Sequence, residues 1–336
     1  MRLEVIQKTK AAVSGAIQEF SPFDISRQVV GQFSLRPRDP WRRTVARLVS
    51  RAALCWQQPM VRRAVGVSIP VPHDFACIED RFGSDASLAV LLRLTRRESV
   101  ESVLIPGCYL GGEDIQFWLR RGVRRLAGID VYSLQERWAT IVPQLRCYYG
   151  ADITFQQATI EKMPFPNGSF DLLATDTVLE HVRNLDAMVR ESARVLRAEG
   201  WVWHCFGPLY YCFGGDHCMA AYGDTAGYDH LLLSEDEYQR RIWDQPFFDK
   251  HPDPNLPFWA RQNQFSFATA IDYIEQFQKR FRLRFIVLKV SAKALEYRQN
   301  QPERWKRLIE AGAAEHDLLI KSVCVVAQTK EGGPDE

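Results

Sequence analysis

The middle of the chain alternates short apolar runs with segments whose apolar residues repeat at helical spacing. Five of these runs have the length and composition of strands, and they are separated by helical patterns such as the one at 115–119. An alternation of this kind predicts right-handed crossovers, and therefore a parallel sheet covered by helices on both faces. The predicted strands are 102–105, 126–130, 153–157, 170–176 and 200–206.

The alternation stops after Phe206. The segment 207–264 is rich in aromatic residues and glycine, and Ser234 and Glu237 form a capping box that predicts a helix start. An insertion at this point lies at the carboxyl edge of the sheet, where open α/β folds bind ligands. Its aromatic residues favour a large, partly apolar acceptor or a sugar face, and a loop with its own small core is an equal alternative. The remaining chain predicts helices at 267–281 and 302–313 and strands at 283–290 and 318–328.

The N-terminal part is marked by its arginines. The segment 36–63 contains eight arginines and a single acid, Asp39. Its pattern predicts a helix with one apolar face and a basic face opposite. Two interpretations remain open: a helix that meets a membrane surface or the phosphates of a lipid-linked or nucleotide-linked substrate, or a cap helix whose arginines are solvated. The apolar positions are Trp41, Val45, Leu48, Ala52 and Cys55, and the basic ones are Arg43, Arg47 and Arg51.

The composition is that of an ordinary globular protein. Of 336 residues, 46% are hydrophobic and 25% are charged, and the net charge of +2 argues against a nucleic-acid partner. No run approaches the ~18 consecutive apolar residues of a membrane helix, and the opening MRLEVIQKTK has no signal-peptide core. Eight scattered cysteines without a CxxC pair are typical of reduced thiols, so we expect a cytoplasmic protein.

A glycine turn follows the first predicted strand. Gly107, Gly111 and Gly112 stand between that strand and a helical pattern. A strand that ends in such a turn brings backbone N–H groups close to a ligand. The second predicted strand ends at Asp130, where an α/β nucleotide fold places the carboxylate that accepts hydrogen bonds from ribose hydroxyls. Together these features favour a nucleotide-containing cofactor.

Two further motifs are MPFPNGSFD at 163–171 and VLEHV at 178–182, which we expect to open the helix after the fourth strand. With the glycine turn and Asp130, they make the chain resemble the class I S-adenosylmethionine-dependent methyltransferases over roughly residues 85–206. The resemblance implies an α/β fold with a Rossmann-like, mostly parallel seven-stranded sheet, helices on both faces and an antiparallel last strand. It also implies S-adenosylmethionine as cofactor. We expect an N-terminal helical accessory or cap segment at 1–80 and a methyltransferase domain at 81–330, with an acceptor-side insertion at 207–264.

The resemblance also implies which residues line the cofactor site. Asp130 would bind the ribose, and Thr159 and Ile160 would contact adenine. Asp176 and Thr177 would face the methionine end of the cofactor or the acceptor. The cofactor-binding residues predicted in this way are Gly107, Cys108, Tyr109, Gly111, Asp130, Thr159, Ile160, Asp176 and Thr177.

Three positions depart from the family pattern. The family usually has an acid at Ile105, a glycine at Tyr109 and an acid at Thr159. Tyr109 places a bulky side chain where bare backbone is expected, and we expect a positive φ there. These departures leave open a second interpretation, a methyltransferase-like protein with a degenerate cofactor site that acts as a binding or scaffold subunit. Asp130 and the acceptor-like insertion favour an enzyme.

The insertion also supplies candidate catalytic histidines. Methyl transfer is an in-line displacement, so an enzyme mainly positions the reactants, and a hydroxyl acceptor also needs a general base. His217, in the glycine-rich turn 214–217, is the predicted base, and His230 is its rival. Asp176 or Asp229 would orient the imidazole of His217.

The acids of the insertion could alternatively hold a metal ion. Two acid–histidine pairs, at 216–217 and 229–230, carry ligands of hard cations. Aspartate and histidine are also ordinary turn residues, so we predict no metal site. His181 and His204 are interpreted as structural residues.

The sequence therefore predicts a methyltransferase that acts on a small-molecule, sugar-linked or lipid-linked acceptor. Oxygen is favoured over nitrogen or carbon as the methylated atom only because histidines are available as bases. A peripheral membrane contact through 36–63 and a homodimer both remain open.

Overall fold

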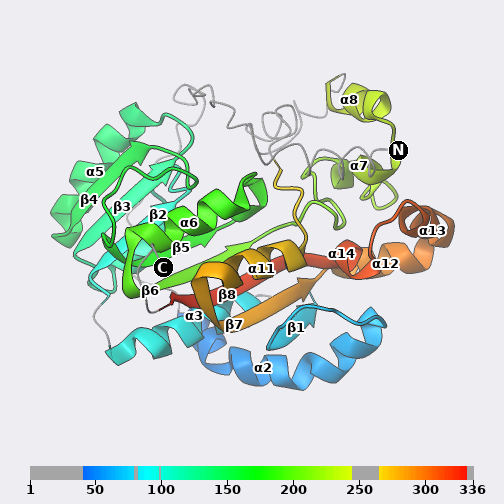
Figure 1. Ribbon diagram of the computed structural model, residues 1–336, viewed down its shortest axis with the longest axis horizontal. Helices are drawn as coiled ribbons and strands as arrows, with labels where there is room; N and C mark the ends of the chain where they lie inside the picture. The colour runs from blue at the N-terminus through cyan, green and yellow to red at the C-terminus, as the bar shows by residue number, and fades with distance from the viewer. Residues whose placement is uncertain (1–40, 79–81, 98–99, 244–264, 331–336) are drawn as a thin grey trace.

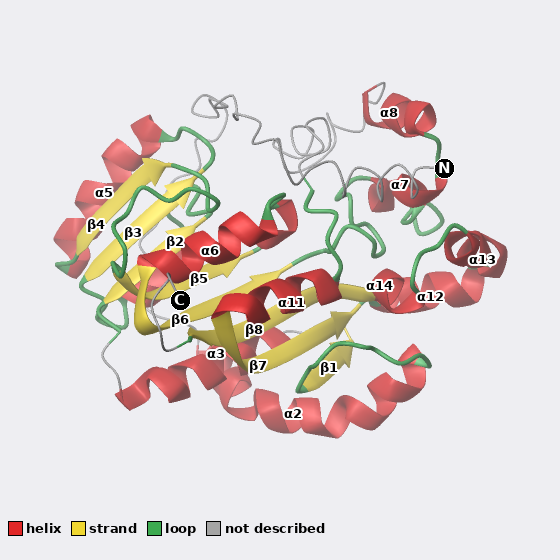
Figure 2. Ribbon diagram, viewed as in Figure 1, coloured by secondary structure: helices red, strands yellow, loops and turns green. Residues whose placement is uncertain are grey.

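The computed structural model describes residues 41–78, 82–97, 100–243 and 265–330 (Figures 1 and 2). Within these ranges the chain forms an eight-stranded sheet in the order β1-β7-β8-β6-β5-β2-β3-β4. Neighbouring strands are parallel except at β8, which runs antiparallel to both β6 and β7. The strands are β1 (Phe75–Ile78), β2 (Ser102–Pro106), β3 (Arg125–Asp130), β4 (Asp152–Gln157), β5 (Phe170–Asp176), β6 (Leu196–Phe206), β7 (Phe281–Val290) and β8 (Ile320–Thr329).

The helices cover the sheet and extend beyond the carboxyl ends of its strands (Figure 1). Around the sheet lie α2 (Trp41–Val65), α3 (Phe82–Leu94), α4 (Glu113–Leu119), α5 (Gln135–Tyr149), α6 (Leu185–Val195) and α11 (Ala270–Arg280). The other helices are α7 (Asp229–Leu232), α8 (Glu235–Trp243), α12 (Ala292–Asn300), α13 (Pro302–Glu310) and α14 (Glu315–Leu319). Short 3₁₀ turns are η2 (Thr95–Arg97), η3 (Leu179–His181) and η4 (Met219–Tyr222).

The predicted α/β fold is confirmed, and the sheet has one strand more than expected. The five central strands, the two late strands and the antiparallel direction of the last strand all agree with the prediction. The additional strand, β1, pairs in parallel with β7 at the edge of the sheet. Asp74 fixes this edge, because its N–H donates to the Ile286 carbonyl at 2.9 Å and its carboxylate accepts from the Ile286 N–H at 2.8 Å.

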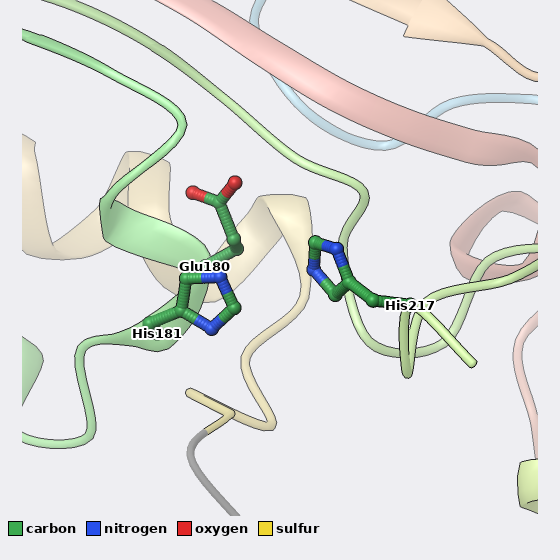
Figure 3. A group of neighbouring side chains, drawn as sticks. All are labelled: Glu180, His181 and His217. Atoms are coloured by element: carbon green, nitrogen blue, oxygen red, sulfur yellow. The ribbon is translucent and has the colours of Figure 1, made fainter. Parts of the chain in front are cut away.

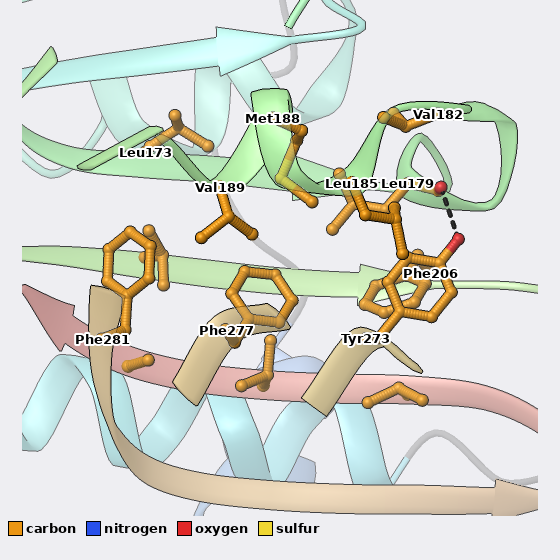
Figure 4. Packing of buried hydrophobic residues seen from close by; sticks show 14 of the residues in the cluster. Leu173, Leu179, Val182, Leu185, Met188, Val189, Phe206, Tyr273, Phe277 and Phe281 are labelled. Carbon is orange, nitrogen blue, oxygen red and sulfur yellow. Dashed lines mark hydrogen bonds between the residues drawn. The ribbon is translucent and has the colours of Figure 1, made fainter. Parts of the chain in front are cut away.

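Alternate residues of each strand face two different hydrophobic layers. Val103 and Ile105 lie in the layer that contains residues of α3, α4 and α5, whereas Leu104 between them lies in the layer of α6 and α11. Figure 4 shows the second layer, in which side chains of α6 and α11 meet over the sheet. There the Tyr273 hydroxyl donates to the Leu179 carbonyl at 2.7 Å, which joins α11 to η3.

The helix predicted within 36–63 exists as α2, but it packs through a different face. Ala52 and Cys55 were expected on the apolar packing face, and both are exposed. The reason is a pair of polar contacts between Gln58 and β1. The Gln58 side-chain amide donates to the Ala76 carbonyl at 2.6 Å, and its oxygen accepts from the Ala76 N–H at 3.0 Å. These bonds turn the side of the helix opposite Ala52 and Cys55 toward β1. The side chains of 41–48 lie outside the described residues. The buried positions of the helix are Ser50, Leu54, Val61 and Val65.

The VLEHV motif does not open a helix as predicted. It forms the 3₁₀ turn η3, which is followed by extended backbone at Val182. Helix α6 begins only at Leu185, where the Asn184 side chain caps it by accepting from the Ala187 N–H at 3.0 Å. The turn therefore stays at the carboxyl end of β5, and this decides where its side chains lie.

Other local predictions can also be compared with the structure. The capping box at Ser234 and Glu237 is confirmed at the start of α8, with reciprocal hydrogen bonds of 3.0 and 3.3 Å. All eight cysteines lie in the described ranges, and none of them forms a disulfide. Among the described helices, none combines the length and the apolar content needed to cross a membrane. The insertion residues 244–264 lie outside the described residues.

Candidate functional site

The carboxylate of Asp130 stands at the end of β3, where two backbone amides hold it. One oxygen accepts from the Tyr109 N–H at 2.8 Å and the other from the Tyr132 N–H at 3.0 Å. The side chain is 6% exposed, and burial raises its pKa against the opposing effect of these amides. Each oxygen keeps a second lone pair, so it can still accept a hydrogen bond from a ligand hydroxyl.

The glycine turn between β2 and α4 is packed closely at one end and open at the other. The N–H groups of Gly107 and Cys108 both donate to the Ile129 carbonyl, at 2.7 and 3.1 Å. Gly107 has φ +71, and a Cβ at this position would overlap the side chain of Val178. At Gly112 no atom lies within 4 Å of the place of a Cβ, so the backbone there is open to a ligand.

Tyr109 and Ile105, which depart from the family pattern, both fit into the fold. Neither position supplies the acidic group that the family has at Ile105. Tyr109 has the positive φ expected for it, +42, and its carbonyl accepts from the Trp138 indole N–H at 2.7 Å. Ile105 is buried in the hydrophobic layer of α3, α4 and α5. A carboxylate that would orient a cofactor amino group must therefore come from another position.

A second acidic group lies at the end of β5. Asp176 reaches solvent, yet desolvation by the surrounding protein raises its pKa to about 6, with Asp114 on α4 raising it further and Lys289 lowering it. The next residue, Thr177, has φ +54, and its N–H donates to the Cys205 carbonyl at 2.8 Å. The end of β5 thus carries a carboxylate close to the acidic start of α4.

The residues predicted to contact adenine follow β4. The Ala158 N–H donates to the carbonyl of Asp130 at 2.9 Å, so this segment adjoins the end of β3. Thr159 forms an isolated antiparallel bridge with Lys162, and Ile160 is buried in the layer of α6 and α11. Contact of Thr159 and Ile160 with adenine stays a prediction.

Two acids of the insertion are engaged inside the protein. Asp216 is fully buried and accepts from two backbone amides, at 3.0 and 3.2 Å, and from the Tyr238 hydroxyl at 2.9 Å. Asp229 is buried as well and forms ion pairs with Arg241 and Arg304. These contacts stabilise the insertion, and they leave Asp229 poorly placed to orient His217.

His230 lies in the interior of the insertion. It is fully buried, and its Nε2 donates to the Tyr210 carbonyl at 2.7 Å, while its Nδ1 lies 3.8 Å from an oxygen of Asp216. The ring of Tyr228 is stacked on its other side. Among the described residues His230 is thus enclosed by the insertion, whereas His217 is only half-buried.

His217 instead meets two residues of η3 (Figure 3). It belongs to the turn 214–217 and has φ +61. Potential ligand atoms of Glu180, His181 and His217 all lie within 4.8 Å of one another, and the two imidazole ring centres are 5.0 Å apart. The structure thus brings together residues about forty positions apart, from the ends of β5 and β6.

Sequence reasoning missed this cluster. His181 was interpreted as structural, and Glu180 had no assigned role. The acid–histidine pair in VLEHV was visible, but a helix would turn its two adjacent side chains about 100° apart. Only the observed 3₁₀ turn, together with the path of the chain after β6, brings both beside His217.

Comparison with known proteins identifies relatives of the central segment. Residues 104–204 match the family described as a methyltransferase domain. The uncharacterized methyltransferase YcgJ of Bacillus subtilis is 41% identical over 122 residues, which cover 36% of this chain and 47% of that protein. The ubiquinone/menaquinone biosynthesis C-methyltransferase UbiE of Hahella chejuensis is 44% identical over 52 residues, or 16% of this chain and 21% of that protein.

The chain spans less than half the length of these two curated relatives. The crystal structure of YcgJ from Bacillus subtilis can also be superimposed on this chain. The superposition covers 74% of this chain and 99% of YcgJ, with 17% sequence identity and a TM-score of 0.40.

Proposed function

We propose that this chain, whose residues 104–204 form a class I S-adenosylmethionine-dependent methyltransferase domain, transfers a methyl group to an oxygen atom of a small-molecule, sugar-linked or lipid-linked acceptor. The observation that carries the proposal is the carboxylate of Asp130. It is held by two backbone amides at a strand end, beside the open backbone at Gly112, within the matched segment. S-adenosylmethionine is the cofactor that this family implies.

The residues around Asp130 fit such a cofactor. Its two oxygens each have a lone pair left for a ribose hydroxyl, and Ile160 with Thr159 would form the side of the site next to adenine. The turn from Gly107 through Cys108 and Tyr109 to Gly111 would lie along the rest of the cofactor. The cofactor supplies a methyl group on a sulfonium, which is electrophilic without further activation.

The methionine end of the cofactor requires a carboxylate that Ile105 cannot supply. Asp176 is the best replacement, because it lies at the neighbouring strand end and has Asp114 close enough to affect its pKa. Above pH ~6 the Asp176 carboxylate is ionised and would attract the ammonium group of the methionine end. The backbone of Thr177 would lie beside the ammonium group.

His217 is the residue that we propose to activate the acceptor hydroxyl. Its imidazole, when neutral, would accept the hydroxyl proton while the oxygen attacks the sulfonium methyl and the S–C bond breaks. Of the two carboxylates predicted to orient His217, Asp229 is held by two arginines. The half-buried position of His217 beside η3 supports this role.

Calorimetry with S-adenosylmethionine and S-adenosylhomocysteine on the purified chain tests the proposal. We expect micromolar binding of both ligands. Transfer of a ¹³C-labelled methyl group to the acceptor, followed by NMR, would then distinguish O–CH₃ from C–CH₃ products. A C–CH₃ product would refute the choice of oxygen, and absence of cofactor binding would favour the scaffold subunit.

A peripheral contact with anionic lipid is a second proposal, supported by helix α2. Val49, Trp56 and Met60 are 47%, 83% and 66% exposed, and their spacing of seven and four residues puts them on one helical face. The exposed Arg63 lies beside this face. An exposed tryptophan on a helix that also carries basic residues is typical of interfacial helices. A cytoplasmic location and a homodimer stay predictions.

A further inference from the structure

We propose that Glu180, His181 and His217 bind a divalent transition-metal ion. The three side chains converge from two chain segments, η3 after β5 and the turn after β6 (Figure 3). Two imidazoles and one carboxylate are the ligand set found at sites for Fe²⁺, Zn²⁺ and related ions. Three protein ligands leave further coordination positions open, as in catalytic rather than structural metal sites.

The buried carboxylate of Glu180 gives a second, independent indication that a ligand binds here. The residue is 2% exposed, and in the described part of the chain neither carboxylate oxygen has a hydrogen-bond partner. The backbone amides of Glu180 and Gly207 lie near the carboxylate, but neither meets the geometry of a hydrogen bond to it. Buried carboxylates are normally hydrogen-bonded, paired with a cation or bound to a metal.

The charge around Glu180 also favours a cation. Asp176 and Cys205 are the nearby groups that disfavour its ionised form, and no ion pair compensates it within the described residues. A divalent ion would supply the missing positive charge and displace the proton of the carboxyl group. A protonated Glu180 buried without a partner is the alternative, and it would cost the desolvation of two polar oxygens.

The distances are compatible with this role. Ligand atoms around a tetrahedral ion at ~2.1 Å are about 3.4 Å apart, and the three groups here lie within 4.8 Å of one another. The side chains would have to turn for their ligand atoms to reach this separation around one ion. The ring of Phe265, stacked on His217 at 6.1 Å between centres, provides an apolar wall on one side.

The turn that presents His217 is held in place by its own hydrogen bonds. The His217 N–H donates to the Gly214 carbonyl at 2.9 Å, and the buried carboxylate of Asp216 accepts from two amides just beyond it. A left-handed conformation at a residue with a Cβ costs about 1–2 kcal/mol. Such conformations persist where the surrounding structure enforces them, and they are frequent at functional sites.

For its chemical role, this inference rests on the proposed methyl transfer. The acceptor hydroxyl would occupy an open coordination position, and the cation would lower the pKa of that hydroxyl. Its proton leaves to solvent, the oxygen attacks the sulfonium methyl, and the S–C bond breaks to release S-adenosylhomocysteine. His217 would then activate the hydroxyl through the ion rather than by accepting the proton itself.

The test is metal binding by the full-length protein after removal of metals with a chelator. Co²⁺ is titrated while its visible absorption is followed, and Zn²⁺ is then added as a competitor. We expect one ion per chain, and at least tenfold weaker binding in Glu180→Gln and in His217→Gln. His73→Gln, at an exposed histidine outside the cluster, is the matched control and should bind like the unmodified protein.

Binding of S-adenosylhomocysteine is measured on the same samples. It should stay within about twofold of the unmodified protein in both cluster variants, which shows that they are folded. Absence of Co²⁺ and Zn²⁺ binding up to millimolar concentrations would overturn the inference. Metal affinities in both cluster variants equal to that of the unmodified protein would overturn it as well. If the unmodified protein does not bind S-adenosylhomocysteine, the proposed function is refuted. The measured metal affinities would still decide whether the three side chains bind a metal ion.

Discussion

The regular core at 102–206 and the insertion after it contribute to the candidate site in opposite ways. In the core, Asp130 and Asp176 stand at strand ends, and the direction of the sheet brings them to one edge. In the insertion, the carboxylates of Asp216 and Asp229 are engaged in a hydrogen bond and an ion pair within the protein. His217, by contrast, is only half-buried and meets residues of η3.

The difference shows how each region fixes the positions of its site residues. Parallel strands place the residues that follow them without help from other side chains. A loop has no such frame, so the insertion uses buried polar contacts, such as those of Asp216 and of His230 with the Tyr210 carbonyl. Each of these contacts is costly to break, and together they hold His217 in a conformation that would otherwise be unfavourable.

The sharpest test of this contrast is His217→Ala. If the insertion supplies the activating group, directly or as a metal ligand, kcat should fall by about 10²–10⁴ while affinity for S-adenosylhomocysteine stays nearly unchanged. Steady-state kinetics with a methyl acceptor and calorimetry measure the two quantities. His73→Ala, at an exposed histidine, is the control and should keep full turnover. Full turnover in His217→Ala would remove the insertion from the chemistry.

Asp216→Ala tests whether buried polar contacts hold the insertion. The substitution leaves two backbone amides and the Tyr238 hydroxyl without their acceptor, so we expect a loss of about 2–4 kcal/mol in the free energy of unfolding. Urea denaturation measures this loss. Asp224→Ala removes an exposed ion pair with Lys293 nearby and should cost less than about 1 kcal/mol. Equal losses in the free energy of unfolding for the two substitutions would contradict the claim that buried polar contacts hold the insertion.

The core can be tested through the pH dependence of cofactor binding. The pKa of Asp176 is raised to about 6, so its carboxylate gains a proton as the pH falls through that value and no longer attracts an ammonium group. Affinity for S-adenosylhomocysteine should therefore fall about tenfold from pH 7 to pH 5. Calorimetry at several pH values should show a flatter profile in Asp176→Asn.

For that experiment Asp186→Asn, at an exposed acid on α6, is the control and should keep the slope of the unmodified protein. An unchanged slope in Asp176→Asn would place the ammonium group elsewhere. In that case the core would bind the cofactor through Asp130 alone.

The smallest expected effect concerns α2, which packs on the edge of the core. If its exposed face meets anionic lipid, Trp56→Ala should lower binding to anionic vesicles about fivefold, because the tryptophan no longer enters the interface. Sedimentation should also be salt-sensitive, since surface charges are screened over ~10 Å at 0.1 M salt. Ile309→Ser, at an exposed residue of α13, should bind like the unmodified protein. Equal recovery with neutral and anionic vesicles would leave α2 only its packing role.

Much of the core could be predicted from the sequence because its signals are local. Apolar runs, the glycine turn and the acid at Asp130 lie on consecutive elements, and the rules for parallel sheets then bring them to one edge. The segment of the edge strand β1 was left open as a linker, a strand or a ligand-facing loop, because four apolar residues after two prolines give no period to recognise. The packing face of α2 was wrong because a polar residue, Gln58, fixes its orientation.

The metal-ligand cluster could not be predicted, because it depends on contacts between distant segments. The approach of His217 to Glu180 depends on the path of the chain after β6 and on the 3₁₀ form of η3. Neither leaves a periodic pattern in the sequence. The same holds for Asp229 and His230, which were candidates by residue type and prove to be partners of Arg241, Arg304 and the Tyr210 carbonyl.

The most direct test of the central claim is calorimetric binding of S-adenosylhomocysteine to the unmodified protein and to Asp130→Ala. Hydrogen bonds to a charged acceptor contribute about 1.5–3 kcal/mol each, so the account predicts micromolar binding that weakens more than tenfold in Asp130→Ala. Asp152→Ala, at an exposed acid where β4 begins, should bind like the unmodified protein. Absence of binding to the unmodified protein, or equal affinity in Asp130→Ala, would contradict the claim that this strand end holds the cofactor.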